Sequence, residues 1–315
     1  MIASGFAAAA LARSAGAQNL EAMRIIAPAA PGSGWDQTAR AMQDALQTGQ
    51  ISSSVAITNV PGAAGTIGLA QFVNQHRTDP RALLLSGLAM VGGIITNNSP
   101  MTLDNVAPIA RLTGEYGVIV VKPDSPIRTL ADVVQRLRAN PGEVAWAGGS
   151  AGSADHIMLA LICKAIGVSP QRLSYTAFSG GGQAAAAIMG GHVTAGASGI
   201  GEWESQIKGG QLRAIGISSP GRVAGFETIP TFKEQGVDVE LANWRGVMAA
   251  PGISAEQRAT LTAAITRMRD TPSWRGALQR FGWMDLFLAG DDFAGFLRQN
   301  RAQIGEVLRD LGMAR

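Results

Sequence analysis

Four glycine-rich turns, each between a predicted strand and a predicted helix, constrain the fold of this chain most strongly. They cover residues 28–36, 59–66, 148–153 and 179–183. Short apolar strands that alternate with helices of about 10–15 residues are typical of βα units and a mostly parallel sheet. In such a sheet the turns after the strands lie at the carboxyl ends, where ligands bind. The sequence therefore predicts an α/β protein whose ligand site is built from these turns.

The length and two extended segments predict two lobes. A chain of 315 residues is long enough for about two domains. Residues 118–129 and 241–254 look like crossings between them. We therefore expect residues 18–120 and 248–315 to form one discontinuous lobe, and residues 121–247 to form an inserted second lobe. Two lobes joined by two crossings enclose a cleft that a hinge can close.

Charge and motif content exclude several classes of function. The 26 Lys and Arg residues and 23 Asp and Glu residues leave a net charge of +3, and no window holds a basic cluster, which argues against nucleic-acid binding. A single cysteine, Cys163, excludes an intrachain disulfide, and with only three histidines the usual zinc spacing is excluded as well. Gln37 replaces the third glycine of a dinucleotide-binding motif, and no P-loop occurs. We expect no metal, no cofactor and no nucleic-acid partner.

The first 17 residues are typical of a secretory signal peptide. A run of small apolar residues is followed by Ala15-Gly16-Ala17, an A-x-A-like cleavage site. No Lys or Arg precedes the apolar run, so a disordered tail is the alternative interpretation. No other stretch approaches the roughly 20 apolar residues of a membrane span. We therefore expect export to the periplasm and removal of residues 1–17.

The four turns have the chemistry of an anion site. Helix N-termini leave free N–H groups and a partial positive charge, and glycine lets a ligand approach the backbone. Small hydroxyls in the turns add further donors: Ser33, Thr66, Ser150, Ser153 and Ser179. This combination suits a carboxylate without help from Lys or Arg. Each turn alone is compatible with a tight βα connection, so the hypothesis depends on all four together.

A serine hydrolase is the enzyme alternative. Residues 148–152 match G-x-S-x-G between a predicted strand and a predicted helix, as a nucleophile elbow would, with Ser150 as the nucleophile. That fold needs Ser, then an acid, then His. Asp155 is the only acid between Ser150 and His192, and it lies one turn into the adjoining helix, where it cannot orient a distant histidine. The sequence therefore favours binding over catalysis.

The motifs at these turns resemble a known family. The segments IIAPAAPGSGWDQTARAMQDAL, NVPGAAGTIGLAQFV, GGSAGSADHIMLALICKAIG and YTAFSGGGQAAAAIMGGHV are similar, in order and spacing, to the periplasmic solute receptors of tripartite tricarboxylate transporters, the Bug receptor family. The resemblance covers nearly the whole mature chain. It implies a type II periplasmic-binding-protein fold, with two lobes of mostly parallel sheet flanked by helices and a ligand cleft between them.

The resemblance also implies a function and a set of binding residues. It implies a monomeric receptor for a small, citrate-like di- or tricarboxylate that docks onto a two-subunit membrane permease; a periplasmic sensor for a signalling partner is the alternative. Trp35 and His156 can each contact the ligand or only support the turns. The candidate ligand-binding residues are Ser33, Gly34, Trp35, Asp36, Asn59, Ala64, Gly65, Thr66, Ser86, Ser150, Ser153, His156, Tyr175, Ser179, Gly180, Gly181 and Ser198.

Overall fold

The structure, a computed structural model, describes Leu20, residues 22–178 and residues 181–314. The predicted signal peptide lies outside the described residues. No helix in the described part of the chain combines the length and the apolar character needed to cross a membrane.

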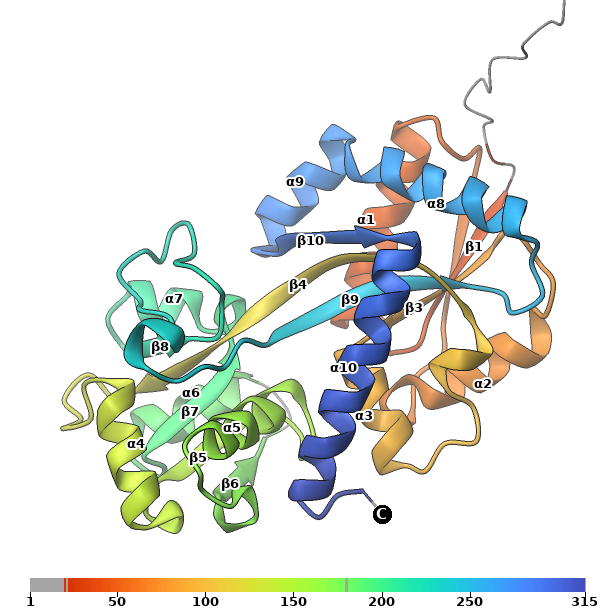
Figure 1. The fold of residues 1–315 in the computed structure, drawn as a ribbon. Helices are drawn as coiled ribbons and strands as arrows, with labels where there is room; N and C mark the ends of the chain where they lie inside the picture. Colours follow the sequence, from red (N-terminus) through yellow and green to blue (C-terminus); the bar gives the residue numbers. More distant parts are fainter. Residues whose placement is uncertain (1–19, 21, 179–180, 315) are drawn as a thin grey trace, which may run out of the picture.

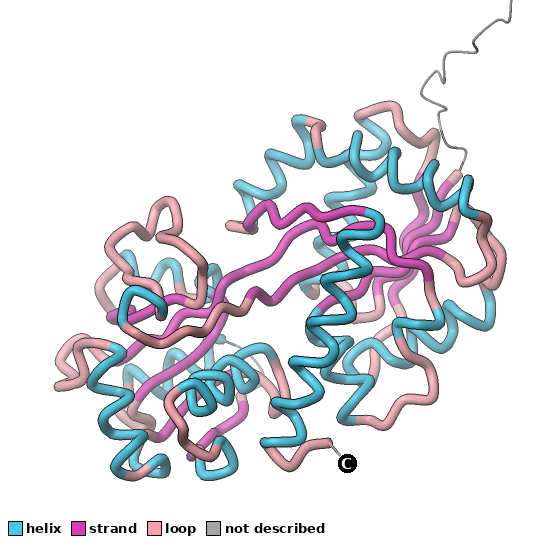
Figure 2. Tube along the Cα trace, in the orientation of Figure 1, coloured by secondary structure: helices cyan, strands magenta, loops and turns pink. Residues whose placement is uncertain are grey.

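Ten strands in the described residues form one sheet that curls through the molecule (Figures 1 and 2). They are β1 (Met23–Ala27), β2 (Val55–Asn59), β3 (Ala82–Gly87), β4 (Ala107–Val121), β5 (Ala145–Gly148), β6 (Ser174–Ala177), β7 (Ala195–Gly199), β8 (Arg213–Ile217), β9 (Ala242–Ala249) and β10 (Met284–Ala289).

Most strands are followed along the chain by a helix, and side-chain caps fix the first residues of several helices. Ser33 and Thr129 each accept a backbone N–H of the first turn, as the sequence pattern predicts. The helices are α1 (Gly34–Thr48), α2 (Thr66–Gln75), α3 (Leu88–Thr96), α4 (Leu130–Ala139), α5 (Ala154–Ala165), α6 (Gly181–Met189), α7 (Glu204–Lys208), α8 (Ala255–Arg269), α9 (Pro272–Phe281) and α10 (Gly290–Asp310).

The sheet has two halves with the same internal order. In the first half β2, β1 and β3 pair in parallel, and in the second half β6, β5 and β7 do the same. Antiparallel strands β9 and β4 lie between the two trios, so the strand order is β2-β1-β3-β9-β4-β7-β5-β6. The parallel trios match the expectation of βα units. The antiparallel centre was not expected.

Two long strands join the halves. The start of β4 pairs with β9, whereas its end, from Gly117 onward, pairs with β7 and β8. Figure 1 shows β4 and β9 running side by side from one half to the other. Only the last five residues of β4 have the continuous apolar pattern that predicts a strand, because polar residues and glycine interrupt this pattern before Gly117.

Alternation along the strands builds a core on both faces of the sheet. In β1, Ile25 packs with the side of α1, α8 and α9, and Ile26 packs with the side of α2, α3 and α10. Trp203 belongs to a third core beside α6 in the second half. Successive side chains of a strand point to opposite faces, so each strand contributes to two layers of helices. The strand ends, and the turns after them, are thereby held at fixed positions.

Candidate functional site

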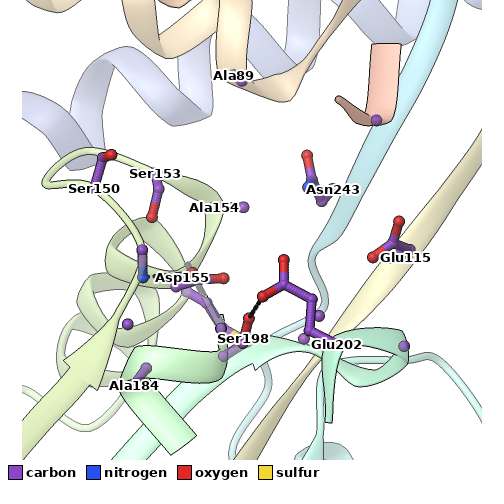
Figure 3. Close-up of a pocket in the computed structure, with 18 of the residues that line it drawn as sticks. Ala89, Glu115, Ser150, Ser153, Ala154, Asp155, Ala184, Ser198, Glu202 and Asn243 are labelled. Atoms are coloured by element: carbon purple, nitrogen blue, oxygen red, sulfur yellow. Dashed lines mark hydrogen bonds between the residues drawn. The ribbon is translucent and has the colours of Figure 1, made fainter. Parts of the chain in front are cut away.

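A cavity of about 500 Å³ lies between the two halves of the sheet. Its lining comes from turns and helix starts of both halves and from the crossing strands β4 and β9. Figure 3 shows the part of this lining around Glu202. The described lining residues are Gly34, Gln37, Ala89, Glu115, Gly117, Gly148, Gly149, Ser150, Ser153, Ala154, Asp155, Met158, Phe178, Gly181, Ala184, Ser198, Gly199, Gly201, Glu202, Leu241, Asn243, Arg245, Phe281 and Trp283.

Four helices present their first turns to this cavity. Gly34 begins α1, Ala89 lies in the first turn of α3, Ala154 begins α5 and Gly181 begins α6. The first N–H groups of a helix have no partner within the helix, and each N-terminus carries a partial positive charge. Four such ends around one cavity provide N–H donors and positive potential for an anion.

Tyr175 and His156 hold the third turn in place through hydrogen bonds to its backbone. The Tyr175 hydroxyl donates to the carbonyl of Gly149 at 2.8 Å, and His156 Nδ1 accepts the N–H of Gly152 at 3.2 Å. The two rings stack with centroids 4.2 Å apart. Burial lowers the pKa of His156, so a neutral ring that accepts at Nδ1 is favoured. Tyr175 and His156 therefore position the turn and do not line the cavity.

Some N–H donors of the turns are already used by the chain's own carboxylates. Gly32 donates to Asp36 at 2.8 Å, and Gly149 donates to Asp155 at 2.9 Å. The Asp36 carboxylate also accepts from Arg40 and from Asn59, and the hydrogen bond from Arg40 is the main cause that lowers the Asp36 pKa. Asp36 thus fixes the first turn internally. The N–H of Gly181, at the start of α6, donates to Glu202 in the same way. The first turns of α1, α3 and α5 hold the other N–H groups at this cavity.

Asp155 is the most perturbed acid at the cavity. Burial raises the pKa of Asp155 to about 7, and the charges of Glu202 and Glu115 act in the same direction, while the hydrogen bond from Gly149 opposes them. An acid with this pKa exchanges its proton near neutral pH.

An ion pair joins the two crossing strands at the wall of the cavity. Arg245 Nη2 on β9 donates to Glu115 Oε1 on β4 at 2.6 Å, and both side chains are largely buried. The guanidinium carbon also lies 5.0 Å from the ring centroid of Trp283. Arg245 is the one basic side chain among the described residues that line the cavity. Because Glu115 neutralises it, it adds little net positive charge.

Glu202 follows β7 and points its carboxylate into the cavity (Figure 3). Glu202 Oε2 accepts from the Ser198 hydroxyl at 3.1 Å. The residue stays in contact with solvent through the open cavity, yet the surrounding protein desolvates the carboxylate enough to raise its pKa, and the charge of Glu115 adds to the effect.

The first two turns contribute unequally. Gly34 lines the cavity, and Ser33, Gly34 and Trp35 line a smaller adjoining cavity of about 180 Å³. The second turn lines neither one. Its Gly65, at φ +90°, lies against the indole of Trp35. A Cβ built on Gly65 would be only 3.0 Å from that ring. The remaining candidates of these turns, which also lie outside both cavities, are Asp36, Asn59, Ala64 and Thr66.

The other candidates divide in the same way. Ser150, Ser153, Gly181 and Ser198 line the cavity, whereas His156 and Tyr175 support it from behind. Ser86 is completely buried in β3, just before the start of α3. Two predicted residues of the fourth turn, Ser179 and Gly180, lie outside the described residues.

The residues of the hydrolase alternative do not form a catalytic arrangement. Within the described part of the chain, no hydrogen bond joins Ser150 to His156 or to His192, and Nδ1 of His156 is engaged by the backbone. A nucleophile needs its base within hydrogen-bond reach. Likewise, the described residues hold no group of three or more His, Cys, Asp or Glu side chains placed to bind a metal ion.

Several lining residues were not found from the sequence. Glu115 and Arg245 lie inside strands with no local motif, so only the pairing of β4 with β9 brings them together. Ala89 carries no sequence signal, because the α3 sequence LAMVGGIIT has two central glycines, which disfavour helix. Glu202 does carry a signal, because it follows the end of β7 closely, and the turns after strands are where the sequence predicts the site.

Comparison with known proteins gives consistent matches. The profile described as tripartite tricarboxylate transporter family receptor matches residues 38–313. The chain is similar to protein BugT of Bordetella pertussis, with 26% identity over 92% of this chain and 89% of BugT. A solved TctC solute-binding protein from Polaromonas shares 26% identity over 92% of this chain and 99% of its own, with a TM-score of 0.80.

A third likeness concerns the fold alone. MatC of Rhodopseudomonas palustris, solved with bound malate, has a TM-score of 0.70 at 21% identity, over 91% of this chain and 99% of that one. The expected α/β periplasmic-binding-protein fold is confirmed by these structural likenesses.

Proposed function

Because this chain belongs to the receptor family of the tripartite tricarboxylate transporters, we propose that it is an exported solute receptor that captures a small carboxylate in the cavity between the two halves of the sheet. The observation that carries this proposal is the meeting of four helix first turns, from both halves, at one cavity. Such ends stabilise an anion by about 0.3–1 kcal/mol each, and more where the site is partly buried.

The proposal includes closure of two lobes on the ligand. Residues 18–120 and 248–315 would form one lobe and residues 121–247 the other, with β4 and β9 as the hinge. Closure would bring the N-termini of α1 and α3 toward that of α5, so that the ligand completes the contact between the lobes. The finer parts of the proposal concern ligand, assembly and partner. The ligand is a citrate-like di- or tricarboxylate and the receptor is a monomer. In the periplasm, the receptor delivers the ligand to a two-subunit permease in the membrane.

Thermal unfolding with a panel of acids tests the function. The panel holds citrate, unbranched dicarboxylates of four to six carbons, their amino and hydroxy derivatives, and aromatic acids. A ligand at about 100 times its Kd stabilises the folded protein by about 2.7 kcal/mol, which is seen as a rise in Tm. We expect at least one acid to raise the Tm. If none of them does, and no acid co-purifies with the protein, the carboxylate proposal is wrong.

A further inference from the structure

Glu202 presents its carboxylate to any ligand that enters the cavity. Glu202 Oε2 accepts from Ser198, and the backbone N–H of Gly181 at the start of α6 also donates to this carboxylate. Figure 3 shows the carboxylate directed into the cavity, on the side across from Ala89 at the start of α3. A carboxylate has about four acceptor positions, so Glu202, which lines the cavity as Asp36 does not, can still receive a hydrogen bond from a bound molecule.

Glu202 forms no ion pair with a described residue, although the nearby charge of Arg245 partly offsets it. Arg245, the basic residue of the described lining, is already paired with Glu115 at 2.6 Å. Asp155 adds a third carboxyl to the same cavity. A ligand carboxylate beside Glu202 would face an unpaired like charge in a partly desolvated place, where repulsion is stronger than in water. A donor there would instead form a hydrogen bond, and an ammonium group would form a charge-assisted one.

The two sides of the cavity therefore differ in their hydrogen-bonding groups. Helix first turns, including those that contain Gly34 and Ala89, offer N–H groups on one side, and Glu202 offers an acceptor on the other. We propose that Glu202 is a specificity-determining residue that selects carboxylates whose far end is a hydrogen-bond donor, an ammonium group above all, and disfavours dicarboxylates. This inference rests on the proposed capture of a small carboxylate, and it replaces the citrate-like ligand of that proposal with an acid that carries a donor at its far end.

Matched ligands that differ only at the far end test the inference. The four-carbon set is 4-aminobutyrate, succinamate and succinate, whose far ends are an ammonium, an amide and a carboxylate. The five-carbon set is 5-aminopentanoate, glutaramate and glutarate. Isothermal titration measures each Kd with the wild-type protein and with Glu202→Gln. In the better-fitting set we expect the wild type to bind the amine at least tenfold more tightly than the dicarboxylate, with the amide between them.

The variant separates charge from shape. Glu202→Gln keeps the side-chain length but removes the charge, so we expect the amine to lose at least tenfold in affinity and the dicarboxylate to gain relative to it. Glu204→Gln is the matched control, because Glu204 is an exposed residue of α7 that pairs with Lys208 and does not line the cavity. It should leave the order of ligands unchanged. The wild-type order alone remains decisive if Glu202→Gln does not fold.

The outcomes distinguish the inference from the function it rests on. If the dicarboxylate binds most tightly to the wild type, or if Glu202→Gln leaves the order unchanged, the role of Glu202 is refuted while the carboxylate receptor stands. If none of the six acids and none of the acids in the thermal panel binds, the proposed function itself is refuted.

Discussion

Replacing Asp155 by asparagine should stabilise the protein at neutral pH. Asp155 is held in a desolvated place, and its pKa is raised by burial to about 7 from the ordinary value of 3.8. A difference of about 3 between the folded and unfolded pKa values corresponds to about 4 kcal/mol, because each pH unit is worth about 1.4 kcal/mol. Asp155 keeps some contact with solvent, so this is an upper limit.

The effect should depend on pH in a defined way. Below about pH 4 the carboxyl is neutral in both states, so the folded protein loses no stability from it. Between about pH 4 and 7 the unfolded chain releases the proton while the folded protein keeps it, and stability falls; above about 7 the loss is complete. In Asp155→Asn the amide oxygen can still accept from Gly149, and no charge has to be buried. We expect a gain of about 2–4 kcal/mol at pH 8 and almost none at pH 4.

Urea unfolding at pH 4, 5.5, 7 and 8 measures this difference. Asp44→Asn is the matched control, since Asp44 is an exposed residue on α1, and its gain should be close to zero throughout. If Asp155→Asn is less stable than the wild type at pH 8, or if its gain is the same at every pH, then the carboxyl is not buried at a cost and the reasoning is wrong.

Three other substitutions probe the cavity and its support. Ser150→Ala should weaken carboxylate binding by roughly 1–3 kcal/mol in isothermal titration, the cost of leaving a ligand oxygen without its donor, and neither form should hydrolyse an activated ester. Gly34→Ala should lower both affinity and Tm, because its Cβ would lie 2.8 Å from Arg245 Nη2, the buried atom that donates to Glu115; Gly276→Ala, with open space around it, is the control. Trp203→Phe should lower the unfolding free energy by about 0.5–1.5 kcal/mol in urea titration, because a buried hydrogen bond to the carbonyl at the start of α6 is lost.

The local parts of the fold were predictable because they depend on neighbours in the chain. The cap at Ser33 and the start of α5 after residues 148–153 follow from residue types a few positions apart. The convergence of the first, third and fourth turns on one cavity could also be anticipated, since strand ends in a parallel sheet face the same edge. The second turn does not reach the cavity; it packs against Trp35 instead.

The acidic side of the cavity could not be predicted, because it depends on contacts between distant segments. Glu115 and Arg245 are 130 positions apart and meet only because β4 and β9 pair in antiparallel register. That pairing also neutralises the basic residue, so a count of charges along the sequence gives no indication of the cavity's potential. In the same way, the sequence marked Asp36 as a ligand residue, whereas its contacts with Gly32, Arg40 and Asn59 engage its carboxylate within the first turn.

A structure of the protein with its tightest-binding carboxylate tests the central claim most directly. We predict that the carboxylate oxygens accept hydrogen bonds from first-turn N–H groups of α1, at Gly34 or Trp35, and of α5, at Ala154 or Asp155, within the cavity between the two halves. If the ligand lies outside this cavity, or if its carboxylate is held by basic side chains and contacts no helix first turn, the account is contradicted.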